Sequence, residues 1–157
     1  ASFELAIAGI LAMAIPAVVL LAPVERPFTG VAILEGAHQV QLKLSRSGVL
    51  DYLTKEQVDD PRVFRVGLLG EPGTLDLEHI DTLKAPGLMF CAQLPGPLNA
   101  RATVETMLNV ASRMRHHLGG TLCDAKRRKL SDDAVVELRE RAHEYDSHYQ
   151  RWLEAEV

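Results

Sequence analysis

The sequence contains few cysteines, and the two that are present, Cys91 and Cys123, lie far apart. This separation lacks the short spacing of a zinc-binding motif. Few, widely spaced cysteines are typical of proteins in a reducing compartment, where thiols stay free. The sequence therefore predicts two free thiols and no metal site. A single disulfide between them is the less favoured alternative.

An excess of basic charge is also missing. The chain carries 17 Lys and Arg residues against 21 Asp and Glu residues, which gives a net charge of −4. Binding to nucleic acid needs a basic surface, because neutralised phosphates supply most of the affinity. A sheet that stacks RNA bases is disfavoured as well, since the outward positions of the predicted strands lack aromatic rings. We therefore expect no nucleic-acid partner.

Catalytic and metal-binding patterns are equally scarce. His116 and His117 are adjacent on a predicted helix, so their side chains point about 100° apart and cannot share a metal ion well. His143 and His148 are five residues apart, which differs from the i, i+4 spacing of a zinc-binding helix. No glycine cluster is followed by the Lys-Ser/Thr pair of a phosphate-binding loop. These absences predict a protein that is not an enzyme and needs no cofactor.

One basic cluster does occur, at residues 126–129, with the sequence Lys-Arg-Arg-Lys. It lies between a predicted short strand and a predicted helix. Four basic residues in such a position most often form a solvated turn. A contact with phosphate or with anionic lipid headgroups is the alternative.

The amino-terminal residues 5–24 contain no charged residue. Twenty apolar residues are enough for a membrane-spanning helix, although the basic start of a cleavable signal peptide is lacking. Pro16 would interrupt such a helix, and residues 17–22 have the composition of a short buried strand that ends at Pro23. Both interpretations stay open, and a compromise places a short hydrophobic helix over residues 4–15 before the strand. We accordingly divide the chain into a hydrophobic segment, 1–16, as a candidate membrane anchor, and a domain, 17–157.

With 157 residues and 47% hydrophobic residues, the chain is long and apolar enough for one domain with a substantial core. Helical periodicity predicts a helix over 31–40, another from Asn99 to Gly119-Gly120, and a last one capped by Ser131. The predicted strands are 17–22, 41–44, 49–53, 64–69, 88–94 and 121–123, with a brief helical turn within 75–83.

The strand between Pro86 and Pro95 has two distinct faces, because successive side chains of a strand point to opposite sides. One face carries four core-type residues, namely Leu88, Phe90, Ala92 and Leu94. The other carries Met89, Cys91 and Gln93. Similarly, in the preceding predicted strand, Leu69 lies on the face of Arg65 and Gly67, opposite Phe64, Val66 and Leu68. The main functional question is whether the second face is covered by the protein or is open to a partner.

Several short motifs follow one another in a distinctive order. They are Pro27-Phe28-Thr29-Gly30, Phe64-Arg65-Val66, Glu71-Pro72-Gly73-Thr74-Leu75-Asp76, Ala85-Pro86-Gly87, Gln93-Leu94-Pro95, Leu118-Gly119-Gly120-Thr121-Leu122-Cys123-Asp124, Arg127-Arg128 and Leu130-Ser131. Together, over roughly residues 17–155, they resemble the carboxy-terminal, FtsZ-binding domain family of the bacterial cell-division protein ZipA.

The resemblance implies an α+β fold with a single antiparallel sheet of about six strands and three helices packed on one face. It also implies a shallow hydrophobic groove on the other face that binds the carboxy-terminal peptide of FtsZ. Carried over position by position, the candidate peptide-binding residues are Leu20, Val49, Leu69, Met89 and Cys91. Family members tend to have Phe where Cys91 stands, so a smaller and more polar groove is expected here.

The function implied by the resemblance is that of a cell-division adaptor that tethers FtsZ to the inner membrane, with the domain facing the cytoplasm. The membrane contact would come from residues 5–24, and the anchor would run into the domain without a linker. If residues 5–24 belong to the core instead, a cytoplasmic location is expected. The alternative function is that of a non-catalytic accessory subunit of another membrane complex.

Overall fold

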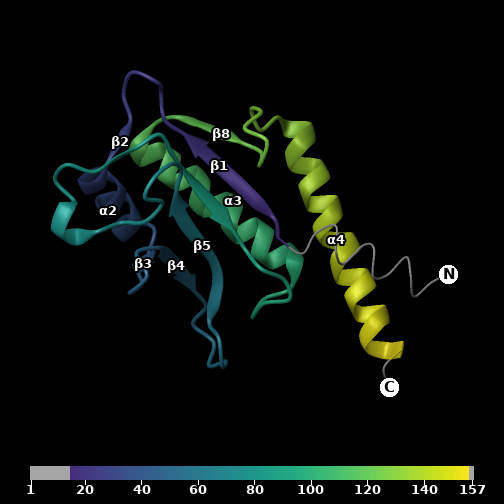
Figure 1. Ribbon diagram of the computed structural model, residues 1–157. Helices are drawn as coiled ribbons and strands as arrows, with labels where there is room; N and C mark the ends of the chain where they lie inside the picture. The colour runs from purple at the N-terminus through teal and green to yellow at the C-terminus, as the bar shows by residue number, and fades with distance from the viewer. Residues whose placement is uncertain (1–14, 156–157) are drawn as a thin grey trace.

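The computed structural model describes residues 15–155 and is built around a six-stranded antiparallel sheet with the strand order β3-β4-β5-β7-β1-β8 (Figure 1). A separate two-stranded ladder joins β2 to β6. In chain order, the elements are β1 (Ala17–Leu21), β2 (Phe28–Thr29), α2 (Gly30–Gln39), β3 (Lys43–Leu44), β4 (Leu50–Leu53), β5 (Arg62–Leu68), η1 (Leu77–His79), β6 (Lys84–Ala85), β7 (Gly87–Cys91), α3 (Ala100–Leu118), β8 (Thr121–Cys123) and α4 (Asp132–Ala155).

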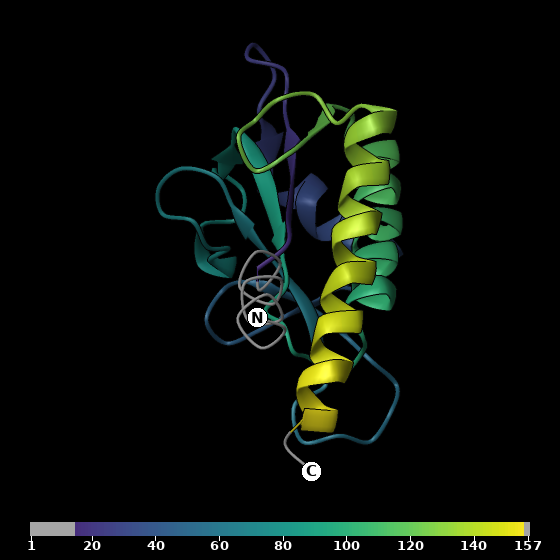
Figure 2. The ribbon, with the colours of Figure 1, turned by 90° about the vertical axis from the view of Figure 1, so that its right-hand side faces the viewer.

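In the described part of the chain, α2, α3 and α4 lie on the same side of the six-stranded sheet, with α4 running alongside α3 (Figure 2). The loop that contains η1 and the loop that follows β8 extend toward the other side of the sheet. This arrangement confirms the predicted α+β fold, in which helices cover one face of a single antiparallel sheet.

Local capping signals explain where the helices begin and end. The Thr29 hydroxyl accepts a hydrogen bond from the backbone N–H of Ala32 at 3.2 Å, and α2 follows it. The side chain of Asn99 caps α3 in the same way, accepting from Ala102 N–H at 2.8 Å. Each bond satisfies an N–H group that has no partner within its helix. Helix α3 ends at Gly119, whose φ of 80° is a left-handed conformation that glycine adopts without strain.

A carboxylate of α4 also caps α3. Asp146 of α4 accepts hydrogen bonds from the backbone N–H groups of Ala100 at 2.7 Å and Arg101 at 3.0 Å. Below this contact, Tyr145 and Ala142 pack against Val104 in a small apolar cluster. Helix α4 is therefore held to α3 by both apolar packing and capping.

The main core lies between the sheet and the helices. On β7, Leu88 and Phe90 face this core, as the alternation predicts, and both are fully buried. The aromatic ring of Phe90 lies 6.4 Å from that of Phe64 on β5. Helix α3 contributes Met107 to the same core.

The amino-terminal part of the described chain is a strand. Residues 17–21 form β1, which is hydrogen-bonded to β7 on one side and to β8 on the other. The strand interpretation of this stretch is confirmed. The alternative prediction, a single membrane-spanning helix over 5–24, is wrong. The backbone groups of β1 pair with neighbouring strands, and Val18, Val19 and Leu20 are fully buried in the domain.

Residues 1–14 lie outside the described residues. They include all of the predicted helix over 4–15 except Ile15, and most of the predicted segment 1–16. Among residues 15–155, no helix combines the length and the apolar character needed to cross a membrane. Cys91 and Cys123 are both free thiols, as predicted.

Candidate functional site

The face of the sheet that points away from the helices carries a compact group of apolar side chains. Three of them, Val19, Leu69 and Cys123, are buried, and Leu21 and Met89 pack against them while staying half-exposed. We call these five residues the apolar patch. Among residues 15–155, no α-helix lies on this face of the sheet (Figure 2).

The strand register shows how the patch is assembled. Val19 of β1 lies opposite Met89 of β7 on one side and Cys123 of β8 on the other. On its other flank, Met89 lies opposite Gly67 of β5. Since glycine has no side chain, the β5 flank of Met89 is left bare. A methyl group at Gly67 would meet only the carbonyl oxygen of Gly73, at 3.6 Å.

A row of charged side chains crosses the open face beside the apolar patch. In register, Lys43 of β3 lies opposite Asp51 of β4, Asp51 lies opposite Arg65 of β5, and Arg65 lies opposite Cys91 of β7. We call Lys43, Asp51 and Arg65 the charged row. The Nε–H of Arg65 donates to an Asp51 carboxylate oxygen at 2.8 Å. The Asp51 side chain is 12% exposed, whereas that of Arg65 is 41% exposed.

Cys91 marks the boundary between the two halves of the open face. Burial raises the pKa of its thiol, and the positive charge of Arg65 offsets this only in part. The thiol is therefore protonated at neutral pH, and Cys91 presents a small, weakly polar group to the surface.

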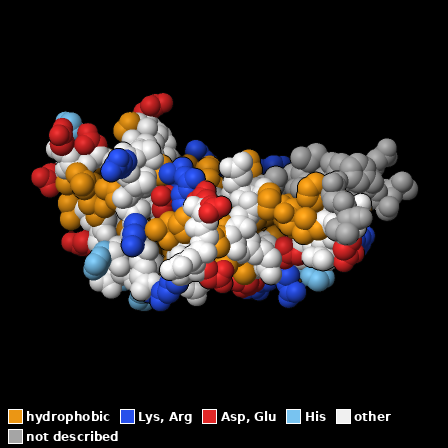
Figure 3. Space-filling view, turned by 90° about the horizontal axis from the view of Figure 1, so that it is seen from below, with side chains coloured by type: hydrophobic (Ala, Val, Ile, Leu, Met, Phe, Trp, Pro, Cys, Tyr) orange, Lys and Arg blue, Asp and Glu red, His pale blue; other side chains and the backbone are white. Residues whose placement is uncertain are grey.

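Apolar side chains form separate groups, with acidic and basic side chains between them, on the side of the molecule that Figure 3 displays. Where β5 begins and β7 ends, the surface is hollowed by a cavity of about 670 Å³, whose lining includes Arg65, Cys91 and Gln93. A second hollow, of about 540 Å³, lies between α3 and α4 and includes Val104 and Val136. That second hollow is formed by the helices and is separate from the open face.

The predicted site residues have different positions in the structure. Leu69 and Met89 belong to the apolar patch, and Cys91 adjoins it. Val49 is half-buried and lies in the turn just before β4, where its carbonyl oxygen accepts from Ser45 N–H at 2.8 Å. Peptide binding by these four residues stays a prediction.

The outward placement of Leu20 is wrong. Leu20 is fully buried in the core on the helix-covered face, opposite Leu88 of β7. Alternation along β1 instead directs Val19 and Leu21 to the open face. The prediction missed these two residues, and also Cys123. Because all five residues of β1 are apolar, its sequence contains no polar position that reveals which face is which.

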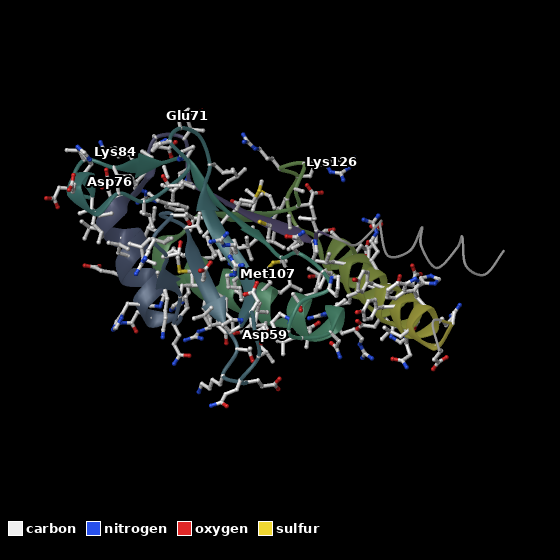
Figure 4. The ribbon with its side chains drawn as sticks, turned by 60° about the horizontal axis from the view of Figure 1, so that its bottom comes forward. Asp59, Glu71, Asp76, Lys84, Met107 and Lys126 are labelled. Carbon is white, nitrogen blue, oxygen red and sulfur yellow. The ribbon has the colours of Figure 1, made fainter. Side chains whose placement is uncertain are left out.

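The basic cluster at 126–129 forms an ordered loop around Asp124. One carboxylate oxygen of Asp124 accepts from the backbone N–H groups of Lys126 at 2.9 Å and Arg128 at 3.0 Å. These hydrogen bonds, with that from the Arg128 guanidinium, lower the pKa of Asp124. Lys126 lies at the same edge of the molecule as Glu71, which follows β5 (Figure 4). All four basic side chains are exposed, as expected for a solvated turn.

Asp76, Glu78 and His79 bring three potential metal-ligand atoms within 4.8 Å of one another. All three side chains are exposed. The carboxylate of Asp76 accepts from Glu78 N–H at 3.0 Å and lies 2.8 Å from Nδ1 of His79. This arrangement is the cap of the short helix η1, which accounts for the proximity of the three groups.

The sequence of this chain matches a known protein family and several curated proteins. The family model described as "ZipA, C-terminal FtsZ-binding domain" matches residues 15–141. The chain is 32% identical over 102 residues to the cell division protein ZipA of Marinobacter nauticus, an alignment that covers 63% of this chain and 30% of the relative.

The cell division protein ZipA of Xanthomonas euvesicatoria is 26% identical over 121 residues, covering 77% of this chain and 50% of the relative. For ZipA of Xylella fastidiosa the values are 25% over 129 residues, with 82% of this chain and 53% of the relative covered. The chain thus spans from less than a third to about half of the length of these curated relatives. The chain belongs to the ZipA C-terminal FtsZ-binding domain family, a non-catalytic family with a role in cell division.

Proposed function

We propose that the open face of the sheet binds the carboxy-terminal peptide of FtsZ, with the apolar patch as its floor. Family membership supports the identity of the partner. The observation that carries the proposal is the half-exposed position of Met89 and Leu21 above the buried side chains of Val19 and Cys123. Met89 and Leu21 still have apolar surface to bury, and the sheet beneath them is already ordered.

Burying apolar area is the expected source of affinity. Complete burial of a side chain the size of Met or Leu contributes about 1.5–3 kcal/mol, so burying the parts of Met89 and Leu21 that are still exposed supplies about 1–2 kcal/mol in total. Because β1 and β7 are rigidly paired along their whole length, little conformational entropy is lost in the protein when the peptide binds. A peptide with two or three apolar anchors is therefore the partner that this patch suits.

The direct test is a titration of a synthetic FtsZ carboxy-terminal peptide against the protein and against Met89→Asp. We expect saturable binding by the parent protein and a loss of about thirtyfold, or about 2 kcal/mol, in the variant, because a carboxylate would replace the central apolar contact. Val136→Asp is a matched control, since Val136 is 50% exposed on α4, on the helix side of the molecule. Circular dichroism of each variant checks that the fold is intact.

Two results would reject the proposal. The first is an absence of saturable binding by the parent protein. The second is a Met89→Asp variant that is folded and binds as tightly as the Val136→Asp control.

A gain of affinity provides a second arm of the same test. Replacing Cys91 by Phe enlarges the apolar surface beside Met89, and an added aromatic contact contributes about 1 kcal/mol. We expect Cys91→Phe to bind the peptide about fivefold more tightly than the parent protein. Cys91→Ser, which keeps the size of the side chain, serves as the control and is expected to change the affinity little.

We also propose that the apolar residues that precede β1 attach the protein to the inner membrane. Support comes from the uncharged sequence of residues 5–14, which precede β1, whereas β1 itself is paired on both sides within the sheet. Membrane fractions of cells that express the chain with and without residues 1–14 test this idea. Retention after carbonate washing and release by detergent are expected only when residues 1–14 are present.

A further inference from the structure

Arg65 lies where the charged row meets the apolar patch. Its register partners are Asp51 on β4 and Cys91 on β7. Met89 lies two residues before Cys91 on the same strand. Arg65 also lines the hollow where β5 begins and β7 ends. A segment that lies across Met89 and continues toward this hollow passes directly over Arg65.

The charge at this point is positive. Within the charged row, the two cations Lys43 and Arg65 face a single carboxylate, that of Asp51. Asp51 is engaged through the Nε–H of Arg65, and a second, long contact of 3.5 Å joins the Nη2 group to the hydroxyl of Ser47. A guanidinium has five N–H donors, so most of its donor capacity is not used by these two contacts.

The exposure of the two partners differs in a way that matters. The Asp51 side chain, at 12% exposed, is largely enclosed by the protein, whereas 41% of the Arg65 side chain is exposed. Asp51 therefore fixes the orientation of the guanidinium from below, and the outer edge of the guanidinium faces the surface. Such a pre-oriented, planar donor suits a carboxylate, which accepts two parallel N–H bonds.

We propose that Arg65 binds an acidic side chain of the peptide and makes this face selective for a segment that carries a carboxylate near its apolar anchors. This inference rests on the proposed function of the open face. Side chains on one face of an extended peptide repeat about every 7 Å, which is also the spacing of Met89 and Cys91 along β7. The selected acidic residue is thus expected two positions away from the residue that contacts Met89.

The test uses the synthetic FtsZ carboxy-terminal peptide and a set of versions in which each Asp or Glu is replaced, one at a time, by Asn or Gln. Each peptide is titrated against the parent protein and against Arg65→Gln. We expect Arg65→Gln to weaken binding of the parent peptide about fivefold, a modest value because the guanidinium is partly solvated. For one neutralised peptide, binding to the parent protein should also be about fivefold weaker. The same peptide should bind Arg65→Gln as tightly as the parent peptide does.

Asp51 supplies a variant with the opposite expected sign. Asp51→Asn keeps the shape of the side chain but removes the negative charge that competes for Arg65, so the acidic peptide should bind about threefold more tightly. Arg101→Gln, which removes a positive charge from α3 on the helix side, is the matched control and should bind like the parent protein.

Arg65→Gln leaves the enclosed Asp51 carboxylate without its cation and can destabilise the fold. The double variant Asp51→Asn/Arg65→Gln removes both charges and keeps the test valid. It is expected to bind the parent peptide as weakly as Arg65→Gln and not to discriminate between the acidic and neutralised peptides.

The outcomes separate this inference from the proposed function. If the parent protein does not bind the peptide at all, the proposed function fails. If it binds, but Arg65→Gln and the double variant bind equally well and no neutralised peptide is weakened, the proposed function stands and the role of Arg65 is rejected. Coupling of Arg65 to one acidic residue supports both.

Discussion

The two faces of the sheet are built from neighbouring residues, but their side chains differ in burial. On β7, Phe90 is fully buried beneath the helices, and Met89, next to it in the chain, is half-exposed on the open face. The helix-covered face contains the large, continuous core that includes Phe64 and Met107. Among the described residues, the apolar cluster on the open face is the much smaller, five-residue apolar patch. The apolar burial that stabilises the fold is thus concentrated on the helix-covered face.

The charged row strengthens this contrast. A buried Asp51 paired with Arg65 is tolerated on the open face because the outer edge of the pair reaches water. The equivalent pair within the helix-covered core would need complete desolvation, which costs several kcal/mol per ion. Charged and apolar side chains therefore lie side by side on the open face, which is the basis of the selectivity proposed for Arg65.

The largest expected effect is seen by comparing two neighbouring residues of β7, Phe90 on the helix-covered face and Met89 on the open face. Phe90→Ala should lower the free energy of unfolding by about 3–5 kcal/mol, because it leaves a cavity beside Phe64 in the core. Met89→Ala should cost only about 1 kcal/mol, since its side chain is already half-exposed. Chemical denaturation of both variants measures the difference. Equal losses would contradict the division of labour between the faces.

An intermediate effect concerns the helices that cover the sheet. Asp146→Ala removes two hydrogen bonds from α4 to the first backbone N–H groups of α3. We expect a loss of about 1 kcal/mol in the free energy of unfolding, as for other helix caps. Glu144→Ala, an exposed position on the same helix, is the control for a change of charge alone. Peptide affinity should stay at the parent value in both variants, because the open face is untouched.

The smallest effect concerns an exposed ion pair at the margin of the open face. Hydrogen bonds from the side chain and backbone of Arg62 lower the pKa of Asp60 from 3.8 to about 2. A lowered pKa in the folded protein means that this pair stabilises the fold above pH 3.8, and that its contribution is lost as the pH falls toward 2. Because both groups are exposed to solvent, the change in overall stability should be small.

Carboxyl-carbon NMR titration of Asp60 measures this effect. In Arg62→Gln the pKa of Asp60 should move up toward 3.8, although the backbone N–H of residue 62 still donates to it. Arg26→Gln, which removes a positive charge elsewhere, should leave the titration unchanged. A titration midpoint that stays near 2 in Arg62→Gln would show that the side-chain contact is unimportant.

Much of the fold was accessible from the sequence because its signals are local. The helix start at Asn99 and the cap Ser131 were both predicted, and each of these side chains accepts a backbone hydrogen bond at the start of its helix, α3 or α4. The faces of β5 and β7 were also predicted correctly, since both strands alternate in residue type. Their outward residues, Arg65 and Met89, differ visibly from the core residues beside them.

Other features were inaccessible because they arise only when distant strands pair. The uniformly apolar β1 has no internal mark of its two faces, so Leu20 was assigned to the open face instead of Val19 and Leu21. A second difference is local: the strand predicted over 41–44 is limited to Lys43–Leu44, because Gln41 adopts a positive φ of 65° in the turn after α2.

The sequence by itself determined the helices, most of the strands, and the position of Met89 and Cys91 on the outward face of their strand. These results follow from capping and from periodicity, which act over a few residues. Only the tertiary structure decided that Val19, Leu69 and Cys123 meet beneath Met89, and that Asp51 joins Arg65 beside Cys91. Strand order and register set those contacts, and both depend on the packing of the whole domain.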